Sequence, residues 1–190
     1  MPENNEAKYR EHSELRSLAT SDVLHSDAAK RIIIAGPGTG KSYLFQEVCK
    51  ELRDGGSTDI LTLSFINELV DDLAVDLYGL STVQTLHSFA LGQLPGDPKM
   101  FLKLGSIIEE DYHVIHDEQI DYAVMLNNLA DEPEKLEFYS ARRRYYNYFS
   151  PSCSVYTLIK YFERDPIKIP SFSQLLIDEY QDFIRLEARL

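Results

Sequence analysis

Residues 31–42 read RIIIAGPGTGKS, and this stretch decides the fold that the sequence predicts. Residues 32–34 are three isoleucines, apolar and β-branched, which favours a strand over residues 31–35, and glycines follow at once. Apolar side chains then recur at helical spacing from Leu44 to Leu52, so a helix follows the glycines. Because a strand, a glycine-rich turn and a helix that opens with Lys41 and Ser42 cradle phosphate groups, the stretch predicts a P-loop.

The residue types of this loop suit a nucleotide. Glycines let successive N–H groups turn toward phosphate oxygens, and the following helix adds the positive end of its dipole. Lys41 supplies a charge for the β- and γ-phosphates, and the Ser42 hydroxyl suits Mg²⁺. ATP and Mg²⁺ are therefore the expected cofactors; the alternative is a glycine-rich turn with a chance lysine. The expected contacts are Gly36, Pro37, Gly38, Thr39, Gly40, Lys41 and Ser42.

The chain around the P-loop alternates between strand and helix patterns. Strand patterns cover residues 59–65, 82–85 and 172–177, and a helix pattern covers residues 67–80 with Asn67 as its expected N-cap. This alternation predicts an α/β fold, in which a parallel sheet carries helices on both faces. Sheets of this kind bind ligands at the carboxyl ends of their strands.

Residues 92–170 have a different character. They are rich in tyrosine and charge and mostly helical in pattern, with prolines at positions 133, 151 and 166. We expect an inserted, mainly helical subdomain here, within a nucleotide-binding domain formed by residues 1–91 and 171–190. Residues 6–19 contain many helix formers and few apolar positions, which predicts either a surface helix or a partly disordered leader.

Composition limits the classes of function. The 190 residues carry 19 Lys and Arg against 31 Asp and Glu, a net charge of −12, so we expect any nucleic-acid contact to be local. Cys49 lies in a predicted helix and Cys153 in a loop-like stretch, and the two cysteines form no disulfide framework and no metal-ligand set. The N-terminal residues lack the apolar segment of a signal peptide, and no run approaches the length of a membrane helix. We expect a cytoplasmic protein.

Residues 175–183, LLIDEYQDF, place two carboxylates directly after an apolar strand. Asp178 at the strand end suits Mg²⁺, and Glu179 is placed to orient or deprotonate a water that attacks the γ-phosphate. The alternative is a solvated acidic turn in an acidic protein. With a P-loop earlier in the same chain, we favour the nucleotide site.

The motifs A-G-P-G-T-G-K-S and D-E-Y-Q-D together resemble the superfamily 1 DNA helicases of the UvrD/Rep/PcrA group. The resemblance implies a RecA-like ATP-binding domain of an ATP-dependent DNA helicase, with the helical subdomain inserted before the D-E-x-Q-D strand. It adds Ala35 and Tyr43 to the nucleotide-binding residues. It also implies that Gln181 contacts the γ-phosphate or the attacking water. The catalytic residues implied are Lys41, Glu179 and Gln181, and those for Mg²⁺ are Ser42 and Asp178.

Two weaker matches imply contacts with single-stranded DNA. LTLSFINELV, residues 61–70, resembles the T-F-T-N-K-A motif of these helicases, although Glu68 replaces its lysine and so removes one phosphate contact. TLHSFA, residues 85–90, resembles their T-x-H-S-F element. The DNA-binding residues implied are Phe65, Asn67, Thr85 and His87.

Other departures from these helicases shape what we expect of the chain. No glutamine precedes Gln46, so the usual adenine-reading residue is not present, and Tyr43 stands where an arginine is common. The sequence stops at Leu190, before the motifs of the second RecA-like domain whose arginines stabilise the transition state. We therefore expect the chain to bind ATP better than it hydrolyses it.

Two other functions fit the same motifs. One is a stand-alone P-loop NTPase switch whose partner supplies the arginine, and the other is a non-enzymatic, nucleotide-gated interaction module. The basic cluster RRRYYNY, residues 142–148, favours a packed helix over a base-stacking surface, because Arg142 shares a helical face with Phe138, Tyr145 and Phe149. For His113 and His116 a solvated helix is favoured over a metal site.

Overall fold

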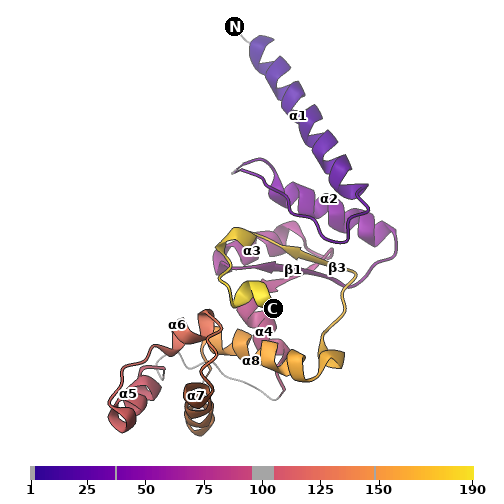
Figure 1. Cartoon of the computed structure of the whole chain (residues 1–190). Coiled ribbons are helices and arrows are strands. Elements are labelled where there is room, and N and C mark those ends of the chain that lie inside the picture. The colour runs from indigo at the N-terminus through magenta and orange to yellow at the C-terminus, as the bar shows by residue number, and fades with distance from the viewer. Residues whose placement is uncertain (1–2, 37, 96–104, 148) are drawn as a thin grey trace. The chain divides into compact units, whose positions relative to one another are not determined.

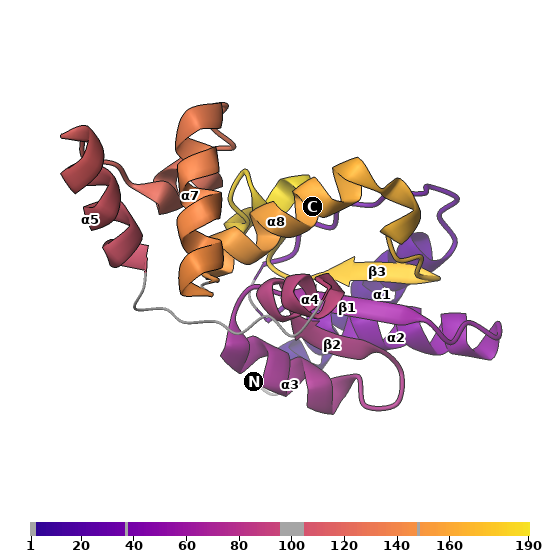
Figure 2. The same ribbon diagram turned by 90° about the horizontal axis from the view of Figure 1, so that it is seen from below.

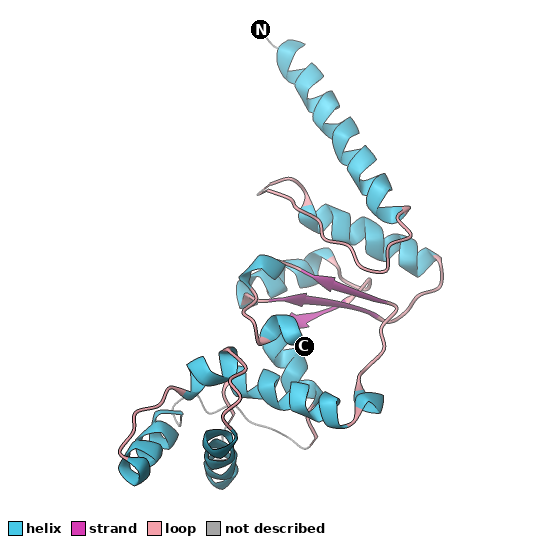
Figure 3. Ribbon diagram, in the orientation of Figure 1, coloured by secondary structure: helices cyan, strands magenta, loops and turns pink. Residues whose placement is uncertain are grey.

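A computed structural model describes residues 3–36, 38–95, 105–147 and 149–190, with side chains from residue 13 onward (Figure 1). Its sheet has three strands, β1 (Ile60–Ser64), β2 (Thr82–Thr85) and β3 (Gln174–Ile177), in the order β2-β1-β3. The strands run parallel (Figure 3). All five residues of the central β1 are buried. The predicted α/β fold with a parallel sheet is therefore confirmed.

Four helices belong to the sheet-forming parts of the sequence: α1 (Glu3–Leu24), α2 (Lys41–Asp54), α3 (Asn67–Asp76) and α4 (Leu86–Gln93). Residues 6–19, for which the sequence predicts either a surface helix or a partly disordered leader, lie within the helix α1. Helix α2 ends at Asp54, and Gly55 and Gly56 follow it. The apolar faces of α2 and α3 meet the sheet, where Cys49, Ile60, Leu73 and Leu77 form a buried cluster.

The remaining helices are α5 (Gly105–His116), α6 (Tyr122–Asn127), α7 (Pro133–Tyr146) and α8 (Pro151–Arg164). Three short 3₁₀ turns follow, η1 (Pro166–Lys168), η2 (Tyr180–Asp182) and η3 (Glu187–Arg189). Prolines open α7, α8 and η1, where a missing N–H costs no helical hydrogen bond. A second buried cluster holds α5–α8 together, with Ile108, Tyr112, Tyr122, Leu126, Tyr139 and Cys153 among its members. Helix α8 also packs on α4 (Figure 2).

The chain divides into two compact units, and the division passes through all three strands. The first unit comprises Met1–Thr62, Asp71–Val83 and Phe172–Leu176. The second comprises Leu63–Val70, Gln84–Ser171 and Ile177–Leu190, and so contains the carboxyl ends of the strands and helices α4–α8. The P-loop belongs to the first unit and the D-E-Y-Q-D turn to the second.

Two sequence predictions are wrong. Residues 31–36 form no strand, and Ile32 and Ile34 are 84% and 98% exposed. A strand requires a hydrogen-bonded neighbour, and within the described ranges no strand of the sheet pairs with this run. Cys153, expected in a loop, lies in α8, because Ser150 caps that helix by accepting the N–H of Cys153 at 3.1 Å.

Candidate functional site

Two glycines of the P-loop in the first unit adopt left-handed backbone conformations. Gly38 and Gly40 adopt φ angles of +72° and +95°, a left-handed region that favours glycine. The Thr39 hydroxyl donates to the carbonyl of Gly36 at 2.7 Å and tightens the turn. Gly40 precedes α2 without a capping side chain, and the first turn of α2 carries no acidic residue. The positive end of this helix is therefore suited to an anion.

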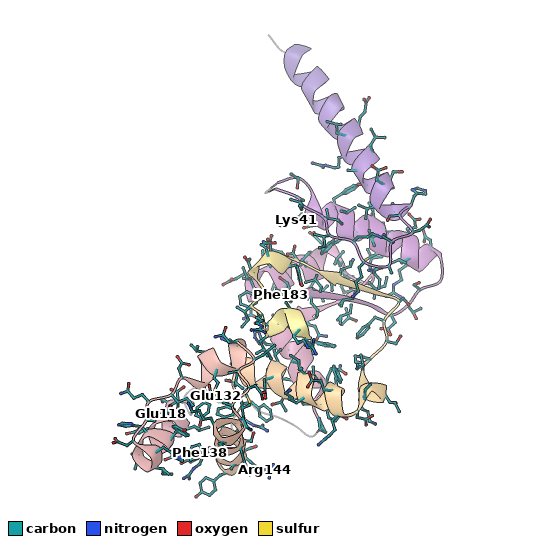
Figure 4. All side chains as sticks on the ribbon, viewed as in Figure 1. Lys41, Glu118, Glu132, Phe138, Arg144 and Phe183 are labelled. Atoms are coloured by element: carbon teal, nitrogen blue, oxygen red, sulfur yellow. The ribbon has the colours of Figure 1, made fainter. Side chains whose placement is uncertain are left out.

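The last three predicted nucleotide contacts, Lys41, Ser42 and Tyr43, lie in the first turn of α2. Lys41 is its first residue (Figure 4), and both Lys41 and Ser42 are half-buried. Tyr43 is 44% exposed, so its ring is open to a ligand. Pro37 lies outside the described residues.

Buried side chains and two side-chain hydrogen bonds connect α2 to the rest of the first unit. Val48 and Cys49 are buried, and burial raises the pKa of the Cys49 thiol. The Gln46 side-chain amide donates to the carbonyl of Asp76 at 2.8 Å, and Arg53 Nε donates to the carbonyl of Leu80 at 2.9 Å. These bonds link the first half of α2 to Asp76, the last residue of α3, and the end of α2 to Leu80, which follows α3.

The acidic turn of the second unit follows β3 directly. Asp178 is buried at 8% exposure, and its N–H donates to the carbonyl of Leu63 at 2.9 Å, which continues the pairing with β1. Glu179 has a φ of +50°, an unusual value for a residue with a side chain, and its carboxylate accepts a hydrogen bond from Gln181 Nε2. The turn thus contains one buried carboxylate, that of Asp178, followed by the hydrogen-bonded pair Glu179 and Gln181.

Aromatic rings gather on the same unit, just past the ends of β1 and β2. The rings of Phe65 and His87 lie 6.1 Å apart, and Phe183 lies 6.3 Å from Phe65 (Phe183 is labelled in Figure 4). Tyr180 extends the group at 5.7 Å from Phe183. Phe65 and Tyr180 are 37% and 47% exposed, so the cluster presents ring surface to solvent. We call these four residues the aromatic cluster.

The comparisons with known proteins agree with a P-loop domain. Residues 22–190 match the family model described as an AAA domain. The chain belongs to this family. Domains of this type are nucleotide-binding P-loop NTPases, which generally bind ATP with Mg²⁺. Neither the curated proteins nor the solved structures gave a match.

Of the other two residues expected to bind DNA, Thr85 has a structural partner and Asn67 is exposed. Thr85 is buried and caps α4: its hydroxyl accepts the N–H of Ser88 at 3.1 Å and donates to the Ser88 hydroxyl at 2.9 Å. Asn67 is exposed at the start of α3. The structure therefore brings Phe65 and His87 together, while the Thr85 hydroxyl is engaged in a helix cap.

One residue of this region was not predicted. Glu187 is 5% exposed, and its carboxylate lies 3.2 Å from His87 Nε2 and accepts the N–H of Ile184 at 3.0 Å. Burial lowers the pKa of His87, and the Glu187 carboxylate partly offsets that effect. A single glutamate among 31 acidic residues gives no sequence signal of its own.

The remaining candidates of the AAA domain have structural roles. Arg142 lies 5.3 Å from the Phe138 ring centre and 3.4 Å from Asp111, as the packed-helix interpretation requires, although Tyr145 is exposed at 78%. Among the residues that the structure describes, no group of three His, Cys, Asp or Glu side chains is arranged to hold a metal. Within the same residues, no helix has the length and apolar character to cross a bilayer.

Proposed function

We propose that this AAA domain is the ATP-binding motor domain of a UvrD-like, ATP-dependent DNA helicase. The loop before α2 carries the nucleotide part of the proposal, since Gly38 and Gly40 are left-handed and Lys41 opens the helix. The D-E-Y-Q-D motif at residues 178–182 supports the helicase part by resemblance. Residues 92–170 serve in this proposal as the inserted helical subdomain.

The nucleotide chemistry is assigned to five side chains. Lys41 neutralises charge on the β- and γ-phosphates, and Ser42 and Asp178 hold the magnesium ion. Magnesium, when bound, withdraws charge from the phosphate oxygens. Glu179 orients and deprotonates the attacking water, and Gln181, which donates to the Glu179 carboxylate, keeps that carboxylate in one orientation.

Single-stranded DNA is the proposed second ligand, and the aromatic cluster is its candidate surface. Bases stack on exposed aromatic rings at about 1–3 kcal/mol each, a strength that does not depend on sequence. Phe65 offers such a ring beside His87.

The proposal also includes a reducing, cytoplasmic setting. The two free thiols, Cys49 and Cys153, are buried, which fits such a setting.

Ligand-induced stabilisation tests the nucleotide part. ATP with Mg²⁺ should raise the melting temperature of the full chain in proportion to the logarithm of ligand concentration. Lys41→Ala should remove the shift, whereas Lys50→Ala should retain it, because Lys50 is exposed and pairs with Glu47 on α2. An equal shift in the wild type and in Lys41→Ala would reject the P-loop assignment.

A nucleotide switch that acts on a protein is the second candidate, and the charge of the chain favours it. The net charge of −12 opposes general adhesion to DNA, and Glu68 stands where the DNA-binding motif has a lysine. Titration with labelled single-stranded DNA in the presence of a non-hydrolysable ATP analogue separates the two. Salt-sensitive binding supports the helicase domain, and no binding at low salt supports the switch.

A further inference from the structure

Arg16 of α1 lies against the P-loop, and no sequence motif includes it. A Cβ built on Gly40 would lie 3.3 Å from both Nε and Cζ of Arg16. Both residues belong to the first unit, and α1 contacts α2 there. The missing side chain of Gly40 therefore has two effects: it permits the left-handed turn, and it lets a guanidinium group reach the loop backbone.

Apolar packing does not explain this approach. Residues 13–19 of α1 are all exposed, and Leu15 and Leu18 are 57% and 63% exposed. The helix thus has no apolar side chain at this level that would drive it onto the loop. The contact with Gly40 places a charged group there instead.

Among the residues whose side chains the structure describes, none provides a counter-charge for Arg16. Within the described parts of the chain, no ion pair includes its guanidinium. The first turn of α2 contains no acidic residue that could provide one. A cation beside the positive end of a helix is unfavourable unless an anion binds between them.

We propose that Arg16 is a phosphate-binding residue of this AAA domain, and that it contacts the β- or γ-phosphate of the nucleotide held by the P-loop. The inference rests on the proposed nucleotide site and adds a residue from α1 to it. P-loop backbone N–H groups surround the phosphates nearest the helix, so a guanidinium against Gly40 is within reach of them. Guanidinium groups bind phosphate through two parallel N–H donors, which makes arginine better suited than lysine to this role.

The contact should show in how affinity depends on the number of phosphates. Charge-assisted hydrogen bonds of this kind contribute about ten- to a hundredfold in affinity. Arg16→Ala should weaken Mg-ATP by that factor and leave AMP almost unchanged. A contact with the β-phosphate should weaken ADP as well, whereas a contact with the γ-phosphate should leave ADP affinity unchanged. Arg16→Lys should recover part of the loss, because it keeps the charge but not the paired donors.

Calorimetric titration of the full chain with Mg-ATP, ADP and AMP measures these affinities. Arg31→Ala is the matched control, since Arg31 is a nearby arginine whose guanidinium donates to the carbonyls of Val23 and Ala28 at 2.6 and 3.2 Å. It should lower the melting temperature while leaving ATP affinity within about twofold.

The outcomes separate this inference from the function on which it rests. If the wild type binds ATP, Lys41→Ala does not, and Arg16→Ala binds like the wild type, then Arg16 has no part in phosphate binding. An equal loss of affinity for AMP and ATP in Arg16→Ala would also overturn the proposal. If the wild type itself binds no nucleotide, the proposed nucleotide-binding function is rejected, and the role of Arg16 is rejected with it.

Discussion

His87 Nε2 lies 3.2 Å from Oε1 of Glu187, and the two residues come from α4 and from the last turn of the chain, η3. Both are largely buried, and the second carboxylate oxygen of Glu187 accepts the N–H of Ile184. The Glu187 carboxylate thus contacts the His87 imidazole, which lies next to Phe65, and also accepts a backbone hydrogen bond in the turn before η3. Glu187 therefore holds the histidine side of the aromatic cluster in place.

Glu187→Ala should lower the free energy of unfolding by about 1–3 kcal/mol, because it leaves the Ile184 N–H and the His87 ring without their acceptor. Glu187→Gln keeps an oxygen for Ile184 and should cost less. Urea denaturation measures both. Glu47→Ala removes a partly exposed partner of Lys50 and should stay within about 0.5 kcal/mol of the wild type. An equally small change in Glu187→Ala would show that the Glu187 carboxylate has no structural role.

The pH dependence of stability should carry the signature of His87. Burial lowers its pKa in the folded state below the ordinary value of 6.5, so the unfolded chain binds the proton more readily. The free energy of unfolding should therefore fall as pH drops below 6.5 toward the folded-state pKa. His87→Gln should flatten this part of the curve. Chemical denaturation at several pH values between about 7.5 and 5.5 tests it, and identical slopes in both proteins would contradict it.

Phe65→Ala should weaken single-stranded DNA binding by roughly five- to a hundredfold, the loss expected for one stacked base. Fluorescence anisotropy with a labelled oligonucleotide at low and high salt provides the measurement. Tyr145→Ala is the matched control, since Tyr145 is an aromatic residue exposed at 78% on α7 and outside the cluster. A larger effect from Tyr145→Ala would move the DNA surface to the basic helix.

Glu179→Gln should reduce ATP hydrolysis by about a hundredfold or more and leave ATP affinity close to that of the wild type. The amide keeps the size of the side chain and its bond with Gln181 but cannot take a proton. Phosphate release under saturating ATP and a separate binding titration measure the two effects. Glu110→Gln, an exposed site on α5, should change neither. Equal turnover in Glu179→Gln and the wild type would remove Glu179 from the catalytic role.

The exposed isoleucines before the P-loop offer a test of the observed fold. Ile32→Ser and Ile34→Ser should each change the free energy of unfolding by less than about 0.5 kcal/mol, since both side chains are almost fully exposed. Leu61→Ala in β1, at 2% exposure, should cost about 2–5 kcal/mol. A large loss in Ile34→Ser would show that residues 31–35 are packed as the sequence predicts.

Local patterns predicted most of the fold, and the failures have physical causes. The positions of α2, β1, β2 and β3 follow from spacing and turn residues that act within about ten residues, so they are readable from the sequence. Residues 31–35 have strand composition, but strand formation depends on a neighbour that no local pattern specifies. Cys153 was readable in principle, since Ser150 followed by Pro151 is a helix-start signal.

Some residues of the candidate site could likewise be predicted from the sequence, and others could not. The P-loop and the acidic turn are continuous motifs, so their residues could be named in advance. The remaining contacts join residues far apart in the chain: Glu187 meets His87 across 100 positions, and Arg16 meets Gly40 across 24. Neither contact repeats with a period or belongs to a motif, so only the folded chain brings them together.

Thr85 is both the last residue of β2 and the N-cap of α4, so no hinge separates the strand from the helix. The imidazole two residues later therefore inherits its orientation from the register of the sheet. Inserting one residue into β2 would rotate that ring away from Phe65 by reversing the side-chain alternation of the strand. Natural variation in ligand preference at position 87 should therefore come from replacement of the side chain. A change in the length of β2 would instead move the ring away from Phe65.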